Sequence, residues 1–432
     1  MKIEPVRVER TGSRSRIASR IVWEDCERPP LDLYFETDNG AGNGLFPHAN
    51  PFLIAAATPA FRHREQRIQV TDTVSPELVQ GLNTVMSWMR RWFRPHHSLP
   101  KLEVRPEPSP LRMKPERRAG SFFSGGVDSL ATLRWNRVHF PASHPGSIRE
   151  GLLVFGLEIE TDEAFALALE ANRALAADAD LALVPIFTNI RRLDEDWDFY
   201  RNEFQGAILA AIAHALAGRL RSISIAATYD IANLGPWGSH PAIDTNFSTH
   251  RLTVHHDGVW LSRLDKLKLL LDWPTALKRM RVCNETAGYN SEALNCGRCE
   301  KCVRTILELM ALGAFDRADA FQKRDLSESF VATTYIHDDY VASCYRDLVG
   351  PLRTGGLHDL SRGVESALAR YSGEVGLRGR LKRFDREYLN GALRALRKAA
   401  RRTVKTVSAN GSSRPPLWQL GALQSILECC IL

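Results

Sequence analysis

The sequence predicts an α/β protein: a parallel sheet with helices on both faces, preceded by an α+β module and followed by a helical region. Short apolar runs at 151–159 and 181–189 have the length and the branched residues of buried strands. The run at 202–218 has helical length and ends at a glycine, and a further strand is expected at 222–228. Strands and helices that alternate in this way form parallel sheets. The three expected parts are 1–105, 119–315 and 316–432.

The composition is that of a globular protein from a reducing compartment. Of the 432 residues, 44% are hydrophobic and 25% are charged, which is ordinary for globular domains. There is no apolar run of about eighteen residues and no charged-then-apolar amino terminus, so we expect neither a membrane span nor a signal peptide. Four of the eight cysteines lie within 283–302 and the others are scattered, which does not indicate a disulfide framework. We therefore expect a cytoplasmic protein.

The net charge of +7 comes from one segment near the carboxyl end. Residues 371–410 contain eleven Lys or Arg and three Asp or Glu, so the rest of the chain is close to neutral. This basic segment is expected to be a solvated helix face, or a contact for RNA, a partner protein or an anionic membrane surface. The last four residues, CCIL, fit the C-a-a-X prenylation pattern, but so short a match carries no prediction.

The first part of the chain, 1–105, is expected to form strands and a helix. The stretches at 16–25 and 30–38 alternate apolar and polar residues, as half-buried strands do. Ser75 and Pro76 are typical of a helix N-cap and first turn, and the apolar residues after them share one face: Leu78, Leu82, Val85, Met89 and Trp92. The charged, proline-rich stretch at 105–118 predicts a linker.

The stretch SFFSGGVDSLA, residues 121–131, predicts a strand, a tight loop and a helix. Glycines allow backbone N–H groups to point toward one centre, and the helix dipole adds positive potential, so the loop should bind phosphate. Neither the P-loop NTPase pattern nor the dinucleotide-binding glycine pattern is present in the required setting. The expected phosphate-binding residues are Ser124, Gly125, Gly126, Val127, Asp128 and Ser129.

Four cysteines form the pattern C-x12-C-x2-C-x2-C, at Cys283, Cys296, Cys299 and Cys302. The two-residue spacings allow successive thiolates to turn onto one metal ion, and four thiolates suit a closed tetrahedral zinc site. Because no coordination position stays open, the zinc ion should be structural. A [4Fe–4S] cluster is the alternative, since it can use a similar run of cysteines.

The string Ser-Gly-Gly-x-Asp-Ser resembles the pyrophosphate-binding loop of the N-type ATP pyrophosphatases, the PP-loop superfamily. With the cysteine pattern that follows it, the chain is similar to the 7-cyano-7-deazaguanine synthases, the QueC-like family, over residues 119–315. The resemblance implies a Rossmann-like fold of the adenine nucleotide alpha hydrolase type. It also implies that ATP is bound with Mg²⁺, is cleaved between its α and β phosphates, and transfers AMP to the substrate.

Three further segments resemble that family. Arg201, at the start of a helix, corresponds to an Arg-Asn pair, and Lys266 in LSRLDKLKLL corresponds to a lysine segment. His240 and Asp244 in GSHPAIDTNF correspond to the segment that recognises the deazaguanine base. The resemblance therefore implies catalytic roles for Arg201, Lys266 and Asp128, and substrate binding by His240 and Asp244.

The chain departs from the family pattern at two places. It has Gly156-Leu157-Glu158 where the family has an aromatic-Gly-Gln segment, and Ile243 where the family has a proline before the aspartate. Both departures fall where the substrate would be recognised, so the residues support ATP chemistry more directly than they support one particular base.

Together these residues predict ATP-dependent activation of a deazaguanine-type carboxylate. Adenylation provides AMP as a leaving group, so that an amine can attack and give an amide, a nitrile or a conjugate. The loop would hold the β and γ phosphates and Asp128 would position Mg²⁺ or the loop, while Lys266 and Arg201 neutralise charge near the α-phosphate. No glutaminase motif is present, so ammonia or another amine should come from solution or from a partner. We also expect a homo-oligomer.

Two other functions stay open. A tRNA-modifying enzyme of the thiolation type would bind RNA phosphates with the basic segment and would need a reactive cysteine, for which Cys344 is the candidate outside the cluster. A binding module that senses nucleotides without turnover is the third possibility, although such a module would be free to lose Asp128 or a loop glycine.

Overall fold

The computed structural model describes residues 1–38, 40, 44–108, 116–283, 294–321 and 326–388. Backbone contacts divide the chain into two compact units, Met1–Asp325 and Leu326–Leu432. The first unit contains the loop and the cysteines predicted to form sites. Part of the predicted linker, the basic segment from residue 389 onward and the terminal CCIL lie outside the described residues.

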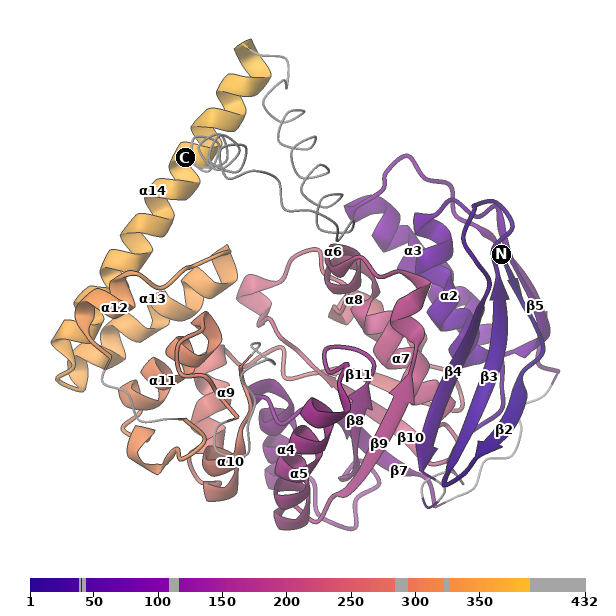
Figure 1. The fold of residues 1–432 in the computed structure, drawn as a ribbon, viewed down its shortest axis with the longest axis horizontal. Helices are drawn as coiled ribbons and strands as arrows, with labels where there is room; N and C mark the ends of the chain where they lie inside the picture. The colour runs from indigo at the N-terminus through magenta and orange to yellow at the C-terminus, as the bar shows by residue number, and fades with distance from the viewer. Residues whose placement is uncertain (39, 41–43, 109–115, 284–293, 322–325, 389–432) are drawn as a thin grey trace, which may run out of the picture. The chain divides into compact units, whose positions relative to one another are not determined.

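The first unit is an α/β structure built on an eleven-stranded sheet (Figure 1). Strands β11, β10, β7, β8 and β9 follow one another across the sheet and pair in parallel. Their bounds are β7 Arg118–Phe122, β8 Ile148–Phe155, β9 Ala182–Thr188, β10 Leu220–Ala226 and β11 Thr253–Asp257. Because all five strands run the same way, the residues after each of them share one edge of the sheet.

The amino-terminal strands extend the same sheet beyond β9, in the order β4, β3, β1, β5 and β6, while β2 pairs with β3. Strand β4 lies antiparallel to β9, with Phe35 opposite Thr188 and Thr37 opposite Ile186. The sheet is therefore continuous from the first 105 residues into the predicted nucleotide-binding part. The strands are β1 Lys2–Ile3, β2 Arg7–Thr11, β3 Arg14–Val22, β4 Leu31–Asp38, β5 Arg67–Val74 and β6 Lys101–Pro106.

Helices cover both faces of this sheet, because successive strand residues point to opposite sides. Leu152 of β8 belongs to the main hydrophobic core, whereas its neighbour Leu153 belongs to a second core formed with α5. The helices packed on the two faces include α2 (Asn50–Arg62), α4 (Val127–His139), α5 (Asp162–Asp178) and α7 (Gln205–Ala215), and α3 (Pro76–Trp92) packs against α2.

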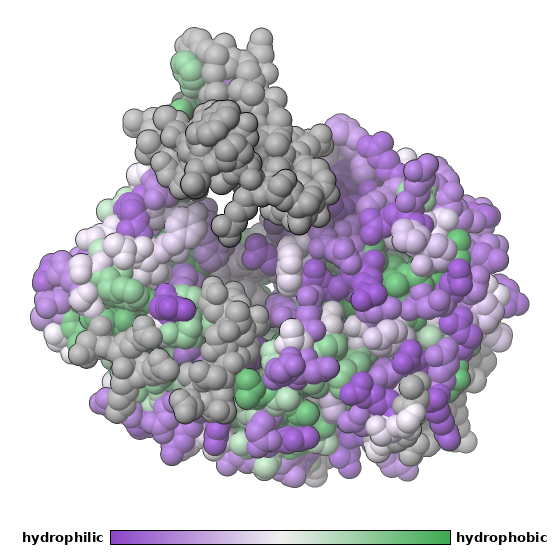
Figure 2. Space-filling view, in the orientation of Figure 1, coloured by the Kyte–Doolittle hydropathy of each residue, from purple (hydrophilic) through white to green (hydrophobic). Residues whose placement is uncertain are grey.

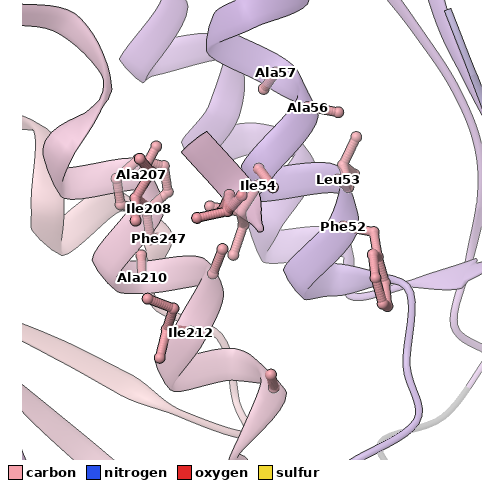
Figure 3. Close-up of a cluster of buried hydrophobic side chains, with 14 of the residues drawn as sticks. Phe52, Leu53, Ile54, Ala56, Ala57, Ala207, Ile208, Ala210, Ile212 and Phe247 are labelled. Atoms are coloured by element: carbon pink, nitrogen blue, oxygen red, sulfur yellow. The ribbon is translucent and has the colours of Figure 1, made fainter. Parts of the chain in front are cut away.

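The main core joins the amino-terminal helices to α7 (Figure 3). Helices α2 and α7 pack against each other through alanines mixed with larger apolar residues. The labelled contributors are Phe52, Leu53, Ile54, Ala56 and Ala57 from α2, and Ala207, Ile208, Ala210 and Ile212 from α7, with Phe247 beside them. Small residues at such a contact allow the helix axes to come close together.

Helix α3 begins where the sequence predicted, with Ser75 as N-cap and Pro76 in the first turn. The Ser75 hydroxyl does not cap the helix; it accepts a hydrogen bond of 2.9 Å from the side-chain amide of Asn50. The predicted apolar stripe is buried at Leu78, Leu82, Val85 and Met89, and Trp92 is half-buried. The serine thus ties α3 to the start of α2.

Replacing Gly81 with alanine is expected to lower the free energy of unfolding by about 1–3 kcal/mol, because overpacking at a tight contact costs that much. A Cβ atom at Gly81 would lie 1.8 Å from the carbonyl oxygen of Asn246. Urea unfolding of Gly81→Ala and of Asn83→Ala, an exposed position on the same helix, measures the difference. The control should change stability by less than about 0.5 kcal/mol, and equal stability of the two variants would contradict this packing.

The rest of the described chain is mainly helical. The first unit continues with α6 Trp197–Phe199, α8 Pro241–Asp244, α9 Arg263–Leu270, α10 Pro274–Arg279 and α11 Glu300–Ala311, and the second unit contains α12 Glu328–Ala332, α13 Asp339–Thr354 and α14 His358–Tyr388. The boundary between the units falls after Asp325, ten residues beyond the 315 expected from the sequence, because the turn at Phe315–Arg317 packs with α10 and α11.

No helix within the described ranges is both long and apolar enough to cross a membrane. On the face drawn in Figure 2, hydrophilic residues predominate over the amino-terminal strands and α3, with smaller hydrophobic areas between them.

Candidate functional site

The predicted phosphate loop lies at the carboxyl end of β7, between that strand and α4. The N–H of Gly126 donates to Ser124 Oγ at 3.3 Å, and Ser129 Oγ donates to the Gly126 carbonyl at 2.9 Å. The N-cap of α4 is Gly126, which has no side chain to cap the helix. The first-turn N–H groups of α4 are therefore available to an anion, and the two serine hydroxyls, 3.4 Å apart, lie beside them.

Gly125 is required by the shape of this loop. Its φ angle is 75°, in the region that side-chain-bearing residues rarely adopt, and a Cβ atom would lie 2.9 Å from Oδ1 of Asn172. Asn172 is buried on α5. The close approach explains why a glycine stands at this position of the loop.

Lys266 and Asp128 form an ion pair at the base of the loop. Lys266 Nζ donates to Asp128 Oδ1 at 2.9 Å, to the Ala227 carbonyl at 2.5 Å and to the Thr228 carbonyl at 3.4 Å. The Lys266 side chain is 2% exposed. All three ammonium protons thus have acceptors within the protein, and Lys266 links the first turn of α4 to the end of β10.

Arg263 is a second cation near Asp128, and the sequence analysis did not single it out. It lies three residues before Lys266 on α9, which places both side chains on one face of the helix. Arg263 Nη1 is 3.9 Å from Asp128 Oδ1. Burial acts to raise the pKa of Asp128, but the charges of Lys266 and Arg263 outweigh burial and hold the pKa below its ordinary value. Asp128 is therefore a carboxylate at neutral pH.

The four predicted cysteines converge on one point. Cys283 Sγ lies 3.8 Å from Cys299 Sγ, Cys296 Sγ lies 3.9 Å from Cys302 Sγ, and all four sulfurs are within 4.8 Å of one another. Four sulfurs bound at about 2.3 Å to one tetrahedral ion would be about 3.8 Å apart. These sulfur–sulfur distances therefore fit a single metal ion such as zinc. They are shorter than the distances in a [4Fe–4S] cluster, where each cysteine binds a different iron.

Asn295 holds the first cysteine in place. Its side chain is fully buried, and Oδ1 accepts from the N–H groups of Val282 at 2.8 Å and Cys283 at 3.2 Å. Its Nδ2 donates to the carbonyls of Met280 at 2.9 Å and Ala320 at 2.8 Å. Such second-layer hydrogen bonds orient metal ligands. Only its position beside Cys296 could have drawn attention to it in the sequence.

Arg201 lies apart from the contacts that assemble around Asp128. It belongs to a π-helical turn, Tyr200–Phe204, and its side chain is exposed. Its carbonyl accepts from the N–H of Gly238 at 3.2 Å. The role in neutralising charge on ATP, which the resemblance implied, stays a prediction.

His240 and Asp244 are both used within the protein. His240 is the N-cap of α8: Nδ1 accepts from the N–H of Ala242 at 3.0 Å, and burial lowers the pKa of the ring. Asp244 is fully buried, and its Oδ2 accepts from Ser239 Oγ at 2.6 Å and pairs with His256 Nδ1 at 2.8 Å. These contacts give both residues positions in the fold, and base recognition by them stays a prediction.

Arg191 is a buried cation at the carboxyl edge of the parallel strands, and nothing in the sequence marked it as a site residue. It lies in the turn directly after β9, with its guanidinium 3.8 Å from the ring centre of Trp197 and 4.7 Å from that of Tyr200. Its Nε and Nη1 are buried and have no hydrogen-bond partner among the described residues. Unused donors on a buried guanidinium indicate a place for an acceptor, such as water or an acidic ligand group.

Cys344, the candidate cysteine for thiolation, is buried within α13 of the second unit.

Comparison of the chain with models of known protein families, with curated proteins and with solved structures found no match.

Proposed function

We propose that this chain is an ATP-dependent enzyme of the N-type ATP pyrophosphatase class with a Rossmann-like fold of the adenine nucleotide alpha hydrolase type. It transfers AMP to a carboxylate and releases pyrophosphate. The observation that carries the proposal is the Ser124–Ser129 loop at the carboxyl end of β7, with Asp128 fixed by Lys266 and Arg263. Ligands of parallel α/β sheets bind at this edge.

The loop has the donors that a pyrophosphate group needs. The first-turn N–H groups of α4 and the hydroxyls of Ser124 and Ser129 would hold the phosphate oxygens, and the helix dipole favours their negative charge. Asp128 Oδ2 accepts no hydrogen bond from the described residues, so it can take part in holding Mg²⁺. A magnesium ion would supply charge neutralisation to the phosphates during transfer.

Arg263 is a second cation beside Asp128 and can stabilise charge during transfer. Its Nη1 lies 3.9 Å from Asp128 Oδ1, on the same face of α9 as Lys266. Preorganised donors of this kind act on the charge that develops in the transition state. In the proposed reaction Lys266 positions Asp128 and Arg263 faces the phosphates.

The acceptor of AMP is a carboxylate of the deazaguanine type. A carboxylate oxygen attacks the α-phosphorus, the bond to the β-phosphate bridging oxygen breaks, and pyrophosphate leaves. An amine then attacks the acyl adenylate and AMP leaves with the former carboxylate oxygen, which gives an amide or a conjugate; dehydration of an amide would give a nitrile. Arg191 supports an acidic substrate because it offers unused donors at this edge of the sheet. The deazaguanine ring of the proposed substrate is supported by the resemblance of residues 238–247 to the segment that recognises this base in the QueC-like family.

Purified protein incubated with α-labelled ATP, Mg²⁺, 7-carboxy-7-deazaguanine and ammonium is expected to form AMP and pyrophosphate only when the carboxylate is present. Asp128→Asn, which keeps the shape of the side chain, should reduce AMP formation by about 10²-fold or more. Asp272→Asn, at an exposed position after α9, is the matched control and should keep full activity.

Three results would speak against parts of the proposal. Formation of ADP in place of AMP would contradict cleavage at the α-phosphate. AMP formation without any carboxylate, at the same rate, would contradict the proposed acceptor. Equal rates for Asp128→Asn and Asp272→Asn would place the reaction outside this loop.

A further inference from the structure

The cysteine site and the phosphate loop share two direct connections in the described residues. The first connection runs through Arg281, two residues before Cys283. The N–H of Arg281 donates to the Gly125 carbonyl at 2.8 Å, and Arg281 Nη2 donates to the Ser124 carbonyl at 3.4 Å. The segment that leads to the first cysteine is thus hydrogen-bonded to the turn that shapes the loop.

The second connection runs through α11, the helix that carries the last two cysteines. Cys299 is the N-cap of α11 and Cys302 lies in its first turn. One to two turns further on, Glu308 Oε2 accepts from Arg263 Nε at 3.3 Å, and Thr305 Oγ1 accepts from Arg263 Nη2 at 3.0 Å. The guanidinium held by α11 in this way is the one that lies near Asp128.

Glu308 is suited to fix Arg263, because its side chain is 1% exposed and cannot exchange its partner for water. Burial raises the pKa of Glu308 and the charges of Arg263 and Arg304 oppose that rise. A buried carboxylate requires a paired cation, so a displacement of α11 would displace Arg263 with it. Arg263 itself is 10% exposed.

One metal ion bound by the four thiolates would join the two connections. Cys283 ends the segment that contacts Gly125, and its sulfur is 3.8 Å from that of Cys299 at the start of α11. A metal held by both sides fixes the distance between Arg281 and α11, and therefore the distance between the glycine turn and Arg263. Without the ion, the four thiols have no common bonding partner that holds them close together.

We infer that the metal site and the phosphate loop are energetically coupled, with Arg263, Glu308 and Arg281 as positioning residues. Metal occupancy sets the order of residues 124–128 and thereby the affinity of the loop for a nucleotide. The nucleotide part of this inference rests on the proposed function; the ordering of the loop does not. Couplings of this kind commonly change affinity by about 5- to 150-fold.

Hydrogen exchange of the full chain with and without bound zinc tests the ordering of the loop and needs no nucleotide. Removal of zinc should increase exchange in peptides that cover 123–130 and 280–283, where the Arg281 N–H reports its bond to Gly125 directly. Peptides from β3, β4 and α2 should keep their protection, because β8 and β9 lie between β7 and β4 in the sheet and no cysteine ligand belongs to these elements. Increased exchange confined to residues near the cysteines, with 123–130 unchanged, would overturn the inference.

Glu308→Gln and Thr305→Val test the second connection in protein that keeps its zinc. Glu308→Gln removes the charge that pairs with Arg263, Thr305→Val removes the acceptor of Arg263 Nη2, and both leave the cysteines intact. Affinity for a non-hydrolysable ATP analogue with Mg²⁺, measured by calorimetry, should fall by about fivefold or more in each variant. Glu170→Gln, an exposed position on α5, is the control and should bind like the unmodified protein.

These results separate the inference from the proposed function. If zinc removal loosens 123–130 but no form of the protein binds the analogue, the coupling holds and the nucleotide proposal fails. If the analogue binds equally well to the zinc-loaded protein, the two α11 variants and the zinc-free protein, the nucleotide proposal holds and the coupling is refuted.

Discussion

Replacing Lys266 with methionine is expected to lower kcat/KM for AMP formation by about 10²- to 10³-fold and to destabilise the protein by about 3–5 kcal/mol. Lys266 is 2% exposed and satisfies three acceptors, among them Asp128 Oδ1. A methionine has similar length but donates no hydrogen bond, so it leaves a carboxylate and two carbonyls without their partner. Thermal melting and AMP release measure the two effects.

Two further variants separate positioning from stability. Lys268→Met changes a lysine on the same helix whose ion pair with Asp265 is exposed, and it should cost less than about 1 kcal/mol and no activity. The double variant Asp128→Asn with Lys266→Met no longer has the residue 128 carboxylate that Lys266→Met leaves unpaired. Part of the stability should therefore return, while activity should not. A Lys266→Met protein as active as Lys268→Met would refute the role given to Lys266.

Loss of the metal is expected to have the second large effect. The protein should contain about one zinc ion per chain, and Cys283→Ser should lose most of it, because three thiolates and a hydroxyl make a poorer closed site. Structural zinc sites contribute about 10–16 kcal/mol of binding free energy in small domains. Here a large sheet remains, so we expect a lower melting temperature and an unfolded 294–311 segment, with the sheet retained.

Metal analysis, with thermal melting and hydrogen exchange, measures this prediction. Cys26→Ser is the matched control: Cys26 is not in the four-cysteine group, so the metal content and the melting temperature should stay close to those of the unmodified protein. Iron with acid-labile sulfide in the purified protein would contradict the zinc site. A Cys283→Ser protein with full metal content would contradict the role of Cys283 as a ligand.

The local features of the candidate site were predictable from the sequence. The glycine turn depends on φ angles that few residues adopt, and the strand before it and the helix after it follow from local periodicity. The cysteines were recognisable because two-residue spacings already bring three of the four together in the chain. The alternating strands at β8, β9 and β10 were expected within a few residues of their observed bounds.

The contacts that connect these features were not predictable. Arg263, Arg281 and Asn295 act through partners 12 to 157 positions away in the chain, and an isolated arginine or asparagine has no local pattern that marks such a role. Lys266 was identified, but its ion pair with Asp128 and its hydrogen bonds to the Ala227 and Thr228 carbonyls depend on how α9 packs beside α4 and the end of β10.

Residues 1–105 show the same division between local features, which the sequence predicts, and long-range contacts, which it does not. The sequence by itself determined β3, β4 and the start of α3, because alternation, an N-cap residue and a first-turn proline are local signals. Only the tertiary structure decided that β4 pairs with β9 and that α2 packs on α7, so that 1–105 shares one sheet and one core with β8 and β10, the two strands beside β7. The physical reason is that strand pairing and helix packing depend on complementary surfaces far apart in sequence, whereas turns, caps and ligand spacings are fixed by the residues beside them.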